Sequence, residues 1–246
     1  MVAQTNIQLY NQLRRQGLTP DDLVLVRRSY ELAAALYSGY YQGDGKPFVA
    51  HGVGVASILA DLGQPVEIVA LGLIHAVYGN GDFGDGRDGG VTSSRRRRVR
   101  EAVGPQLEEL VHRFTERRLD PDSIAEIRRT LPELSDTDRR LQLVAVADHL
   151  EKYVDLGVLY FGDNEDIVSW TESIGDELVG IAEELGEARL ARMVRAAFAE
   201  AAAEERNVPA QLRPPDGLRH LNLVVPASCR PRLSMRARWL NRRVRD

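Results

Sequence analysis

The sequence predicts an all-α protein, and three observations support that fold class. Apolar residues recur at helical spacing in nearly every segment that has a regular pattern. No segment shows convincing alternation of apolar and polar residues, which is the pattern of a half-buried strand. Helix start signals precede several periodic segments. Thr19-Pro20-Asp21-Asp22, for example, offers a cap residue, a first-turn proline and two acids near the positive end of the helix dipole.

The first expected helices lie in the N-terminal half of the chain. Residues 21–37 follow the start signal and carry one apolar face, which predicts an amphipathic helix. A second helix is expected over residues 47–62, where Gly63 stops it, and a third over residues 65–78. The third segment is almost entirely apolar after Glu67, so this helix should be buried on most sides.

A glycine-rich loop, residues 79–92, separates these helices from those that follow. The remaining apolar periodicity predicts helices over residues 93–103, 105–117, 121–130, 135–157, 165–185 and 187–205. The long helix 135–157 starts at Ser135-Asp136, a pair that suits a helix cap. Together the helices are expected to form one bundle.

The composition changes after Arg206, which predicts a helical domain over residues 1–205 and a basic tail over residues 206–246. The tail holds ten arginines against Asp216 and Asp246. Within residues 228–246, apolar side chains recur at helical spacing with a tryptophan beside them: Leu233, Ala237, Trp239, Leu240 and Val244. Such a segment suits the acidic body of its own domain, a homodimer contact, an acidic partner groove or an anionic membrane surface.

Composition and charge exclude several classes of protein. The chain has 246 residues, 43% of them hydrophobic, so it can bury a sizeable core. A net charge of −4 argues against a general nucleic-acid binder. With one cysteine, Cys229, no internal disulfide framework is expected, and a reducing cytoplasm is the simplest compartment. We expect neither a signal peptide nor a membrane-spanning helix.

Three side chains that can bind metals lie inside apolar runs. His51 follows Pro47-Phe48-Val49-Ala50, His75 follows Leu73-Ile74, and Asp148 follows Val144-Ala145-Val146-Ala147. A buried imidazole or carboxylate is costly without a partner. One shared cation would satisfy all three, and this donor set suits iron, manganese or zinc. A metal-free, hydrogen-bonded triad that fixes helix packing is the alternative.

Three segments together resemble a known superfamily. The segment of residues 44–86, DGKPFVAHGVGVASILADLGQPVEIVALGLIHAVYGNGDFGDG, resembles the start of an HD-domain phosphohydrolase. Within that superfamily the pattern is most similar to the (p)ppGpp hydrolase domains of the stringent response. Residues 144–156, VAVADHLEKYVDL, resemble the later Ala-Asp helix of these domains. Residues 99–117, VREAVGPQLEELVHRFTER, resemble the segment that lies between the two. The similarity covers roughly residues 25–160 in order and spacing.

The resemblance implies an HD-domain-like helical bundle with metal ligands at His51, His75 and Asp148. The family's fourth ligand, the Asp after the second His, falls on Ala76. The family's basic residues for nucleotide binding fall near Tyr41, Gln42 and Gly43, and its Glu-Asp pair for water attack falls on Gly79 and Asn80. The Lys and Asn of its last motif fall on Ala145 and Lys152. We therefore expect that this chain does not hydrolyse (p)ppGpp. An uncharacterised branch of HD-like proteins also looks similar, with a small residue and then Tyr-Gly after the second His.

Three ligands would leave open positions on a metal, as catalytic sites require. Two histidines and one carboxylate are also the ligand set of non-haem iron oxygenases. We therefore expect a metal-dependent enzyme, either a hydrolase or an iron oxygenase, that acts on a small anionic metabolite. The alternative is a catalytically inactive HD-like domain that binds a ligand, regulates a partner or serves in assembly.

Further roles are expected for residues around the three ligands. The expected catalytic residues are Tyr78, Asp82 and Lys152, and either Asp82 or Asp85 is expected to replace the missing metal ligand or to act as general base. An anion clamp is expected at Arg95, Arg96 and Arg98. Alternatively, the two aspartates are turn residues and the arginines form a solvated helix face. His149 faces away from its neighbour Asp148 on the helix and is expected to be partly exposed.

Overall fold

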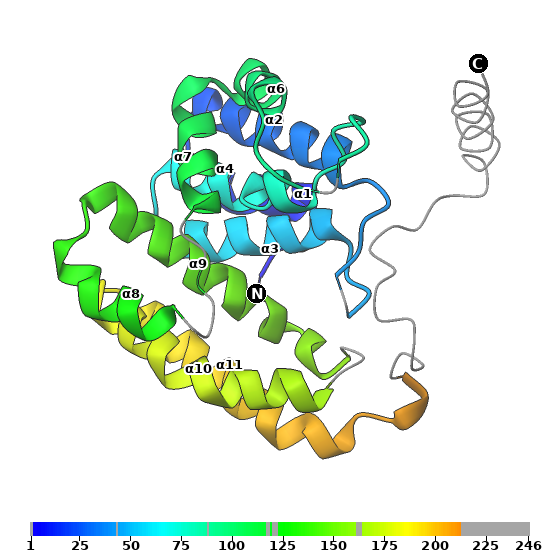
Figure 1. The fold of residues 1–246 in the computed structure, drawn as a ribbon, viewed down its shortest axis with the longest axis vertical. Coiled ribbons are helices and arrows are strands. Elements are labelled where there is room, and N and C mark those ends of the chain that lie inside the picture. Colours follow the sequence, from blue (N-terminus) through cyan, green and yellow to red (C-terminus); the bar gives the residue numbers. More distant parts are fainter. Residues whose placement is uncertain are drawn as a thin grey trace, which may run out of the picture.

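Figure 1 shows the fold in a computed structural model of the protein. The structure describes residues 2–212 apart from residues 43, 88, 117–118, 120–122 and 161–163, and the side chains of residues 164–173 and 210 are not described. Within these residues the predicted all-α fold is confirmed. The described residues hold helices and no strand, apart from an isolated bridge between Tyr41 and Pro47.

The helices follow one another as α1 (Asn6–Arg15), α2 (Pro20–Tyr37), α3 (Phe48–Asp61), α4 (Val66–Ile74), α5 (Val77–Asn80), α6 (Ser93–Val103), α7 (Pro105–Thr115), α8 (Ile124–Thr130), α9 (Asp136–Val154), α10 (Asn164–Glu184) and α11 (Ala188–Glu204). Short 3-10 turns are η1 (Leu131–Glu133), η2 (Gly157–Tyr160), η3 (Glu205–Asn207) and η4 (Ala210–Leu212). The nine predicted helices are confirmed with shifts of a few residues at their ends, except that the third is divided.

Helix α1 is an element that the sequence analysis missed. It begins with a capping box in which Thr5 and Gln8 satisfy each other's backbone N–H groups. Its inner face buries Leu9 and Leu13, which are one turn apart. Both signals are visible in the sequence, since a Thr-x-x-Gln start and an i, i+4 leucine pair are typical of an amphipathic helix.

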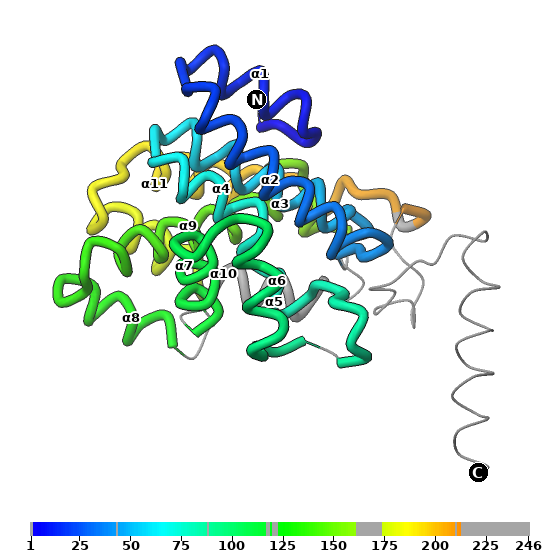
Figure 2. The backbone as a smooth tube through the Cα atoms, turned by 90° about the horizontal axis from the view of Figure 1, so that it is seen from above, coloured from blue at the N-terminus to red at the C-terminus, as the bar shows by residue number. Residues whose placement is uncertain are grey.

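Helix α3 occupies the centre of the bundle. It packs against α1, α2, α4 and α9, as Figures 1 and 2 show. Every residue of α3 from His51 to Ala60 is buried, which explains why this segment is apolar around its whole circumference. A side chain at Gly52 would place its Cβ 2.7 Å from the Leu73 carbonyl oxygen, so α3 and α4 can approach each other closely only because this residue is a glycine.

Helices α10 and α11 pack against each other and against α9 (Figure 1). Helix α9 therefore has α3 and α4 on one side and α10 and α11 on the other. The prediction that His149 is partly exposed is wrong, because α9 is covered around most of its circumference and His149 is 5% exposed. Burial lowers the pKa of His149 to about 4.

The predicted third helix is interrupted directly after His75. Helix α4 ends at Ile74, and Ala76 has φ −101° and ψ 8°, which turns the chain before α5 begins at Val77. The sequence showed one continuous apolar run here and so did not reveal the turn. His75 consequently lies at a helix end, where its ring faces the neighbouring helices.

The predicted boundary near residue 206 is not tested by the fold. Helix α11 ends at Glu204, and the described part of the chain stops at residue 212. The expected basic amphipathic segment, residues 228–246, lies outside the described residues. Among the described residues, no helix is both long enough and apolar enough to span a membrane.

Candidate metal centre

Three helices bring His51, His75 and Asp148 together, as the sequence predicted. His51 comes from the first turn of α3, His75 follows the end of α4, and Asp148 lies on α9. His51 Nε2 is 2.9 Å and His75 Nε2 is 3.5 Å from the same oxygen, Asp148 Oδ1. One ligand atom from each residue lies within 4.8 Å of the others, which is close enough to bind one metal ion.

The other ring nitrogen of each histidine has its own acceptor. His51 Nδ1 lies 2.5 Å from Glu151 Oε2, and His75 Nδ1 lies 2.8 Å from the Gly72 carbonyl oxygen. A backbone carbonyl only accepts, and so does an ionised carboxylate, so both Nδ1 atoms carry the hydrogen. In neutral imidazoles this leaves the Nε2 lone pairs facing Asp148. Three acceptors then meet at one point, which requires a cation or additional protons.

Glu151 is a site residue that the sequence analysis missed. Its side chain is fully buried, yet it contacts His51, the Lys46 ammonium at 2.8 Å and the Gln4 amide at 3.3 Å. The space for this carboxylate exists because residue 54 is a glycine. Any other residue at this position would place its Cβ against Glu151 Oε1. An acid three residues after Asp148, inside a buried helix, was the available signal.

Lys152 lies one turn after Asp148 and pairs with it. Its Nζ is 3.3 Å from Asp148 Oδ1, and its side chain is 26% exposed. Burial alone would raise the pKa of Asp148, but Lys152 and the two histidines hold it well below its ordinary value. Burial opposes protonation of His51, but hydrogen bonds with Asp148 and Glu151 raise its pKa overall. The centre therefore favours a charged carboxylate.

The residues present fit a divalent ion held by three protein ligands. Two imidazole nitrogens and one carboxylate oxygen suit zinc, iron or manganese. Histidine ligands commonly donate their other N–H to a carboxylate or carbonyl oxygen, and both histidines do so here. Ala76, where the resembled family has its fourth ligand, carries no donor atom, so coordination positions would stay open.

Tyr78 lies three residues after His75 but has a different partner. Its hydroxyl donates a 2.9 Å hydrogen bond to Glu108, and the ring is fully buried. Arg96 and Arg100 also bind Glu108, at 2.6 and 2.7 Å, so four side chains join α5, α6 and α7. Burial and the hydrogen bond to Glu108 raise the pKa of Tyr78, although the two arginines oppose this rise. The predicted catalytic role of Tyr78 remains a prediction.

The glycine-rich loop is held by residues that were expected to serve the site. Asp82 accepts a 2.7 Å bond from the Gly84 N–H, as a turn residue does. Asp85 pairs with Arg95 at 2.6 Å, and this contact holds the pKa of Asp85 at about 2. Arg95 is 1% exposed and also donates to two loop carbonyls, so it does not lie on a solvated helix face.

The remaining members of the predicted anion clamp also have protein partners. Arg96 binds Glu108 and Glu109, and Arg98 donates to the Phe83 carbonyl oxygen at 3.0 Å. Both Arg95 and Arg98 lie over the Phe83 ring. These contacts give the arginines structural roles, and anion binding by them remains a prediction.

Two comparisons with known proteins match parts of this chain. A model of a domain of unknown function (DUF6817) matches residues 34–117, which include His51 and His75. GTP pyrophosphokinase rsh from Brucella ovis is 27% identical over 153 residues, which is 59% of this chain and 19% of that protein. The protein of the same name from Brucella abortus matches with the same identity and coverage. The chain thus spans about a fifth of the length of the curated relatives it matches.

Proposed function

We propose that the protein is a divergent HD-fold metalloenzyme that hydrolyses a phosphoester of a small anionic metabolite. One observation carries this proposal. Both imidazoles commit Nδ1 to acceptors, so two Nε2 lone pairs and the Asp148 carboxylate converge. A divalent ion satisfies all three at once. The similarity to GTP pyrophosphokinases supports a phosphate-containing substrate.

Each residue of the centre has a separate task in this proposal. His51, His75 and Asp148 would hold the ion, which would supply Lewis-acid chemistry when bound. Glu151 and the Gly72 carbonyl orient the two rings. Phe48 and Phe114 pack edge-on against the His51 and His75 rings. Lys152, partly exposed beside Asp148, provides a cation for the substrate's anionic group.

The substrate is proposed to differ from (p)ppGpp. The family positions for gripping guanine nucleotides fall near Tyr41 and Gln42, which carry no positive charge. Gly79 and Asn80 stand where the hydrolases have the Glu-Asp pair that assists water attack. A smaller phosphoester, bound by Lys152 and the ion, would not need the guanine-nucleotide contacts. An oxygenase reaction is the alternative chemistry for the same ligands if the ion is iron.

A second candidate function is a ligand-binding regulatory module without catalysis. The Lys152–Asp148 ion pair favours it, because the ammonium already neutralises part of the charge that would attract a metal. A His51 protonated on both nitrogens, donating to Glu151 and Asp148, would complete a metal-free centre.

Metal content is the measurement that tests the proposal. Protein purified without chelators or a metal-binding tag would be measured by plasma mass spectrometry, alongside His75→Ala and Asp148→Ala. We expect about one iron, manganese or zinc per chain in the wild type and less than about a tenth of that in both variants. Asp82→Ala, which removes a carboxylate outside the centre, should keep the metal.

Activity is then measured as phosphate release from a panel of small phosphomonoesters, with (p)ppGpp included. Turnover of a phosphomonoester that is lost in Asp148→Ala would support the hydrolase. Stoichiometric metal without phosphate release would favour the regulatory module, or the oxygenase if iron-dependent oxygen uptake is found. Absence of metal after incubation with each ion would overturn the metal centre itself.

A further inference from the structure

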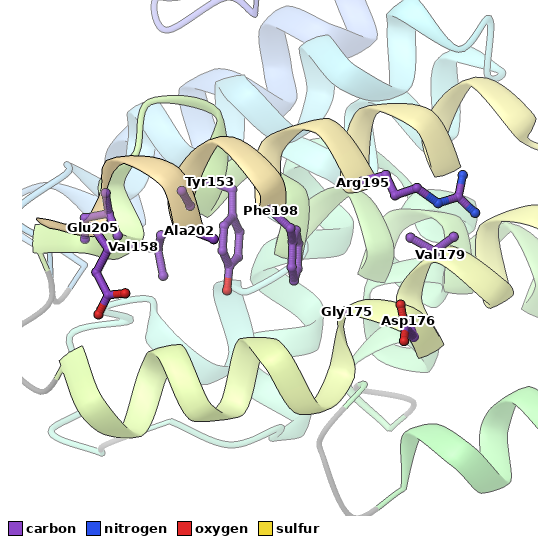
Figure 3. A pocket seen from close by; sticks show the side chains of 11 residues that line it. Tyr153, Val158, Gly175, Asp176, Val179, Arg195, Phe198, Ala202 and Glu205 are labelled. Carbon is purple, nitrogen blue, oxygen red and sulfur yellow. The ribbon is translucent and has the colours of Figure 1, made fainter. Parts of the chain in front are cut away.

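A hollow lies on the other side of α9, away from the metal centre. A cavity of about 270 Å³ opens between the end of α9, η2, α10 and α11 (Figure 3). Its walls are mainly apolar: Tyr153, Val158, Leu159, Val179, Phe198 and Ala201. The Tyr153 and Phe198 rings stack at a centroid distance of 4.1 Å and form one wall. The cavity is open to solvent on one side, so its apolar walls are accessible to an occupant.

The rim of the cavity is acidic at both ends. Glu205 lies at one end and Asp176 at the other, as Figure 3 shows. Asp176 has no hydrogen-bond or ion-pair partner among the described residues. Arg195 also lines the rim, but Glu183 binds its guanidinium at 2.8 Å. An occupant that fits this surface has an apolar side chain for the walls and a cationic group for Asp176.

The chain itself leaves the bundle beside this cavity. After α11, Val208 packs against the apolar cluster of Tyr153, Val158, Leu159 and Ala201, which forms the cavity walls. Residues 213–227 then precede the basic segment. Fifteen residues span at most about 50 Å when extended, so the segment beyond them can return to the cavity.

We propose that the cavity is the docking site for the chain's own basic C-terminal segment, residues 228–246. The segment has seven arginines against one acid, Asp246, which complements the acidic rim. Its apolar residues recur at helical spacing, and a helix of this kind buries one apolar face. A cavity of 270 Å³ admits one or two large side chains, so we assign Trp239 or Leu240 as the anchor.

Hydrogen–deuterium exchange of the full-length chain tests this assignment. The variant Trp239→Ser/Leu240→Ser removes the anchor, and Leu221→Ser/Leu223→Ser makes a matched change outside the segment. We expect amides of residues 153–160 and 195–205 to exchange at least about fivefold faster in the first variant and unchanged in the second. Asp176→Lys, which reverses the charge of the exposed rim carboxylate, should reproduce the first variant. Circular dichroism should show the same helix content in all of them.

Two results would overturn the proposal. If the cavity amides exchange at the same rate in the anchor variant and the wild type, the segment does not dock in this cavity. In the second result, protection of the cavity amides disappears on hundredfold dilution while light scattering shows that a dimer dissociates. That result would assign the cavity to a segment from a second copy of the chain. Protection that is independent of protein concentration supports docking within one chain.

Discussion

His51 Nδ1 lies 2.5 Å from Glu151 Oε2, and neither side chain is more than 2% exposed. This contact connects α3 to α9 at the metal centre and fixes which nitrogen of His51 faces Asp148. A carboxylate on the far nitrogen also makes an imidazole a stronger metal ligand. Lys46 offsets the charge of Glu151, at 2.8 Å, so the buried carboxylate does not remain unpaired.

Glu151→Leu should weaken metal binding by about 10-fold to 100-fold, because it removes the acceptor that orients His51. Glu151→Gln keeps an acceptor oxygen and should lose less. Calorimetric titration of each metal-free variant with the metal ion measures both affinities. Asp155→Asn is the matched control, since Asp155 also binds Lys46 but does not contact His51. Equal affinities in wild type and Glu151→Leu would mean that the contact only joins two helices.

Lys152→Gln separates the two proposed roles of the lysine. The lysine competes with a metal ion for Asp148, and a partly exposed ion pair contributes about 0.2–1 kcal/mol. Metal affinity should therefore rise by up to about fivefold, whereas KM for an anionic substrate should increase. Metal affinity is measured by competition with a chelating dye and KM by phosphate release. A loss of metal in this variant would show that the lysine supports the centre.

The Glu108 cluster predicts a loss of stability in acid. Burial alone would raise the pKa of Glu108, but hydrogen bonds from Arg96, Arg100 and Tyr78 lower it from 4.5 to about 2. Since the folded pKa lies below the unfolded one, the stabilisation is complete above about pH 5 and is lost as the pH falls toward 2. The free energy of unfolding should decrease by on the order of 3 kcal/mol over this range. Urea titrations at each pH measure it.

Glu108→Gln provides the control for this pH dependence. The variant should be less stable at pH 7 by about 3 kcal/mol or more, because the guanidinium groups lose their buried counter-ion. Its stability should then change less between pH 5 and pH 2 than that of the wild type. An unchanged pH dependence would assign the acid sensitivity to other carboxylates, such as Asp85.

The sequence predicted the ligands of the candidate centre but not their supports. His51, His75 and Asp148 could be found because each is a polar residue inside an apolar run, where burial demands a partner. Glu151 could not be identified in the same way, because an acid near the end of a helix is often exposed to solvent, as the neighbouring Asp155 is. Its role depends on Gly54 and Lys46, which are distant in sequence and meet only in the fold.

The fold was predicted more completely than the loop that borders the centre. Helical periodicity identified α2 to α11 because each helix must bury an apolar face. It did not reveal the turn at Ala76, since Ile74, Ala76 and Val77 are all apolar and continue the pattern. Arg95 shows a related limit. Its run of arginines is typical of an exposed face, yet this one side chain is buried because Asp85 and loop carbonyls take its donors.

Ala76→Asp tests whether the missing fourth ligand can be restored. Ala76 is 5% exposed and directly follows His75, so an introduced carboxylate would be buried next to the proposed ion. Without metal, an unpaired buried carboxylate should lower the melting temperature, because its desolvation is not compensated. With zinc or manganese the carboxylate should bind the ion, so metal should raise the melting temperature more than it does in the wild type. Ala76→Asn, which has a similar shape and no charge, should show a smaller metal-dependent rise. Equal metal-dependent shifts in Ala76→Asp and the wild type would mean that position 76 does not face the ion.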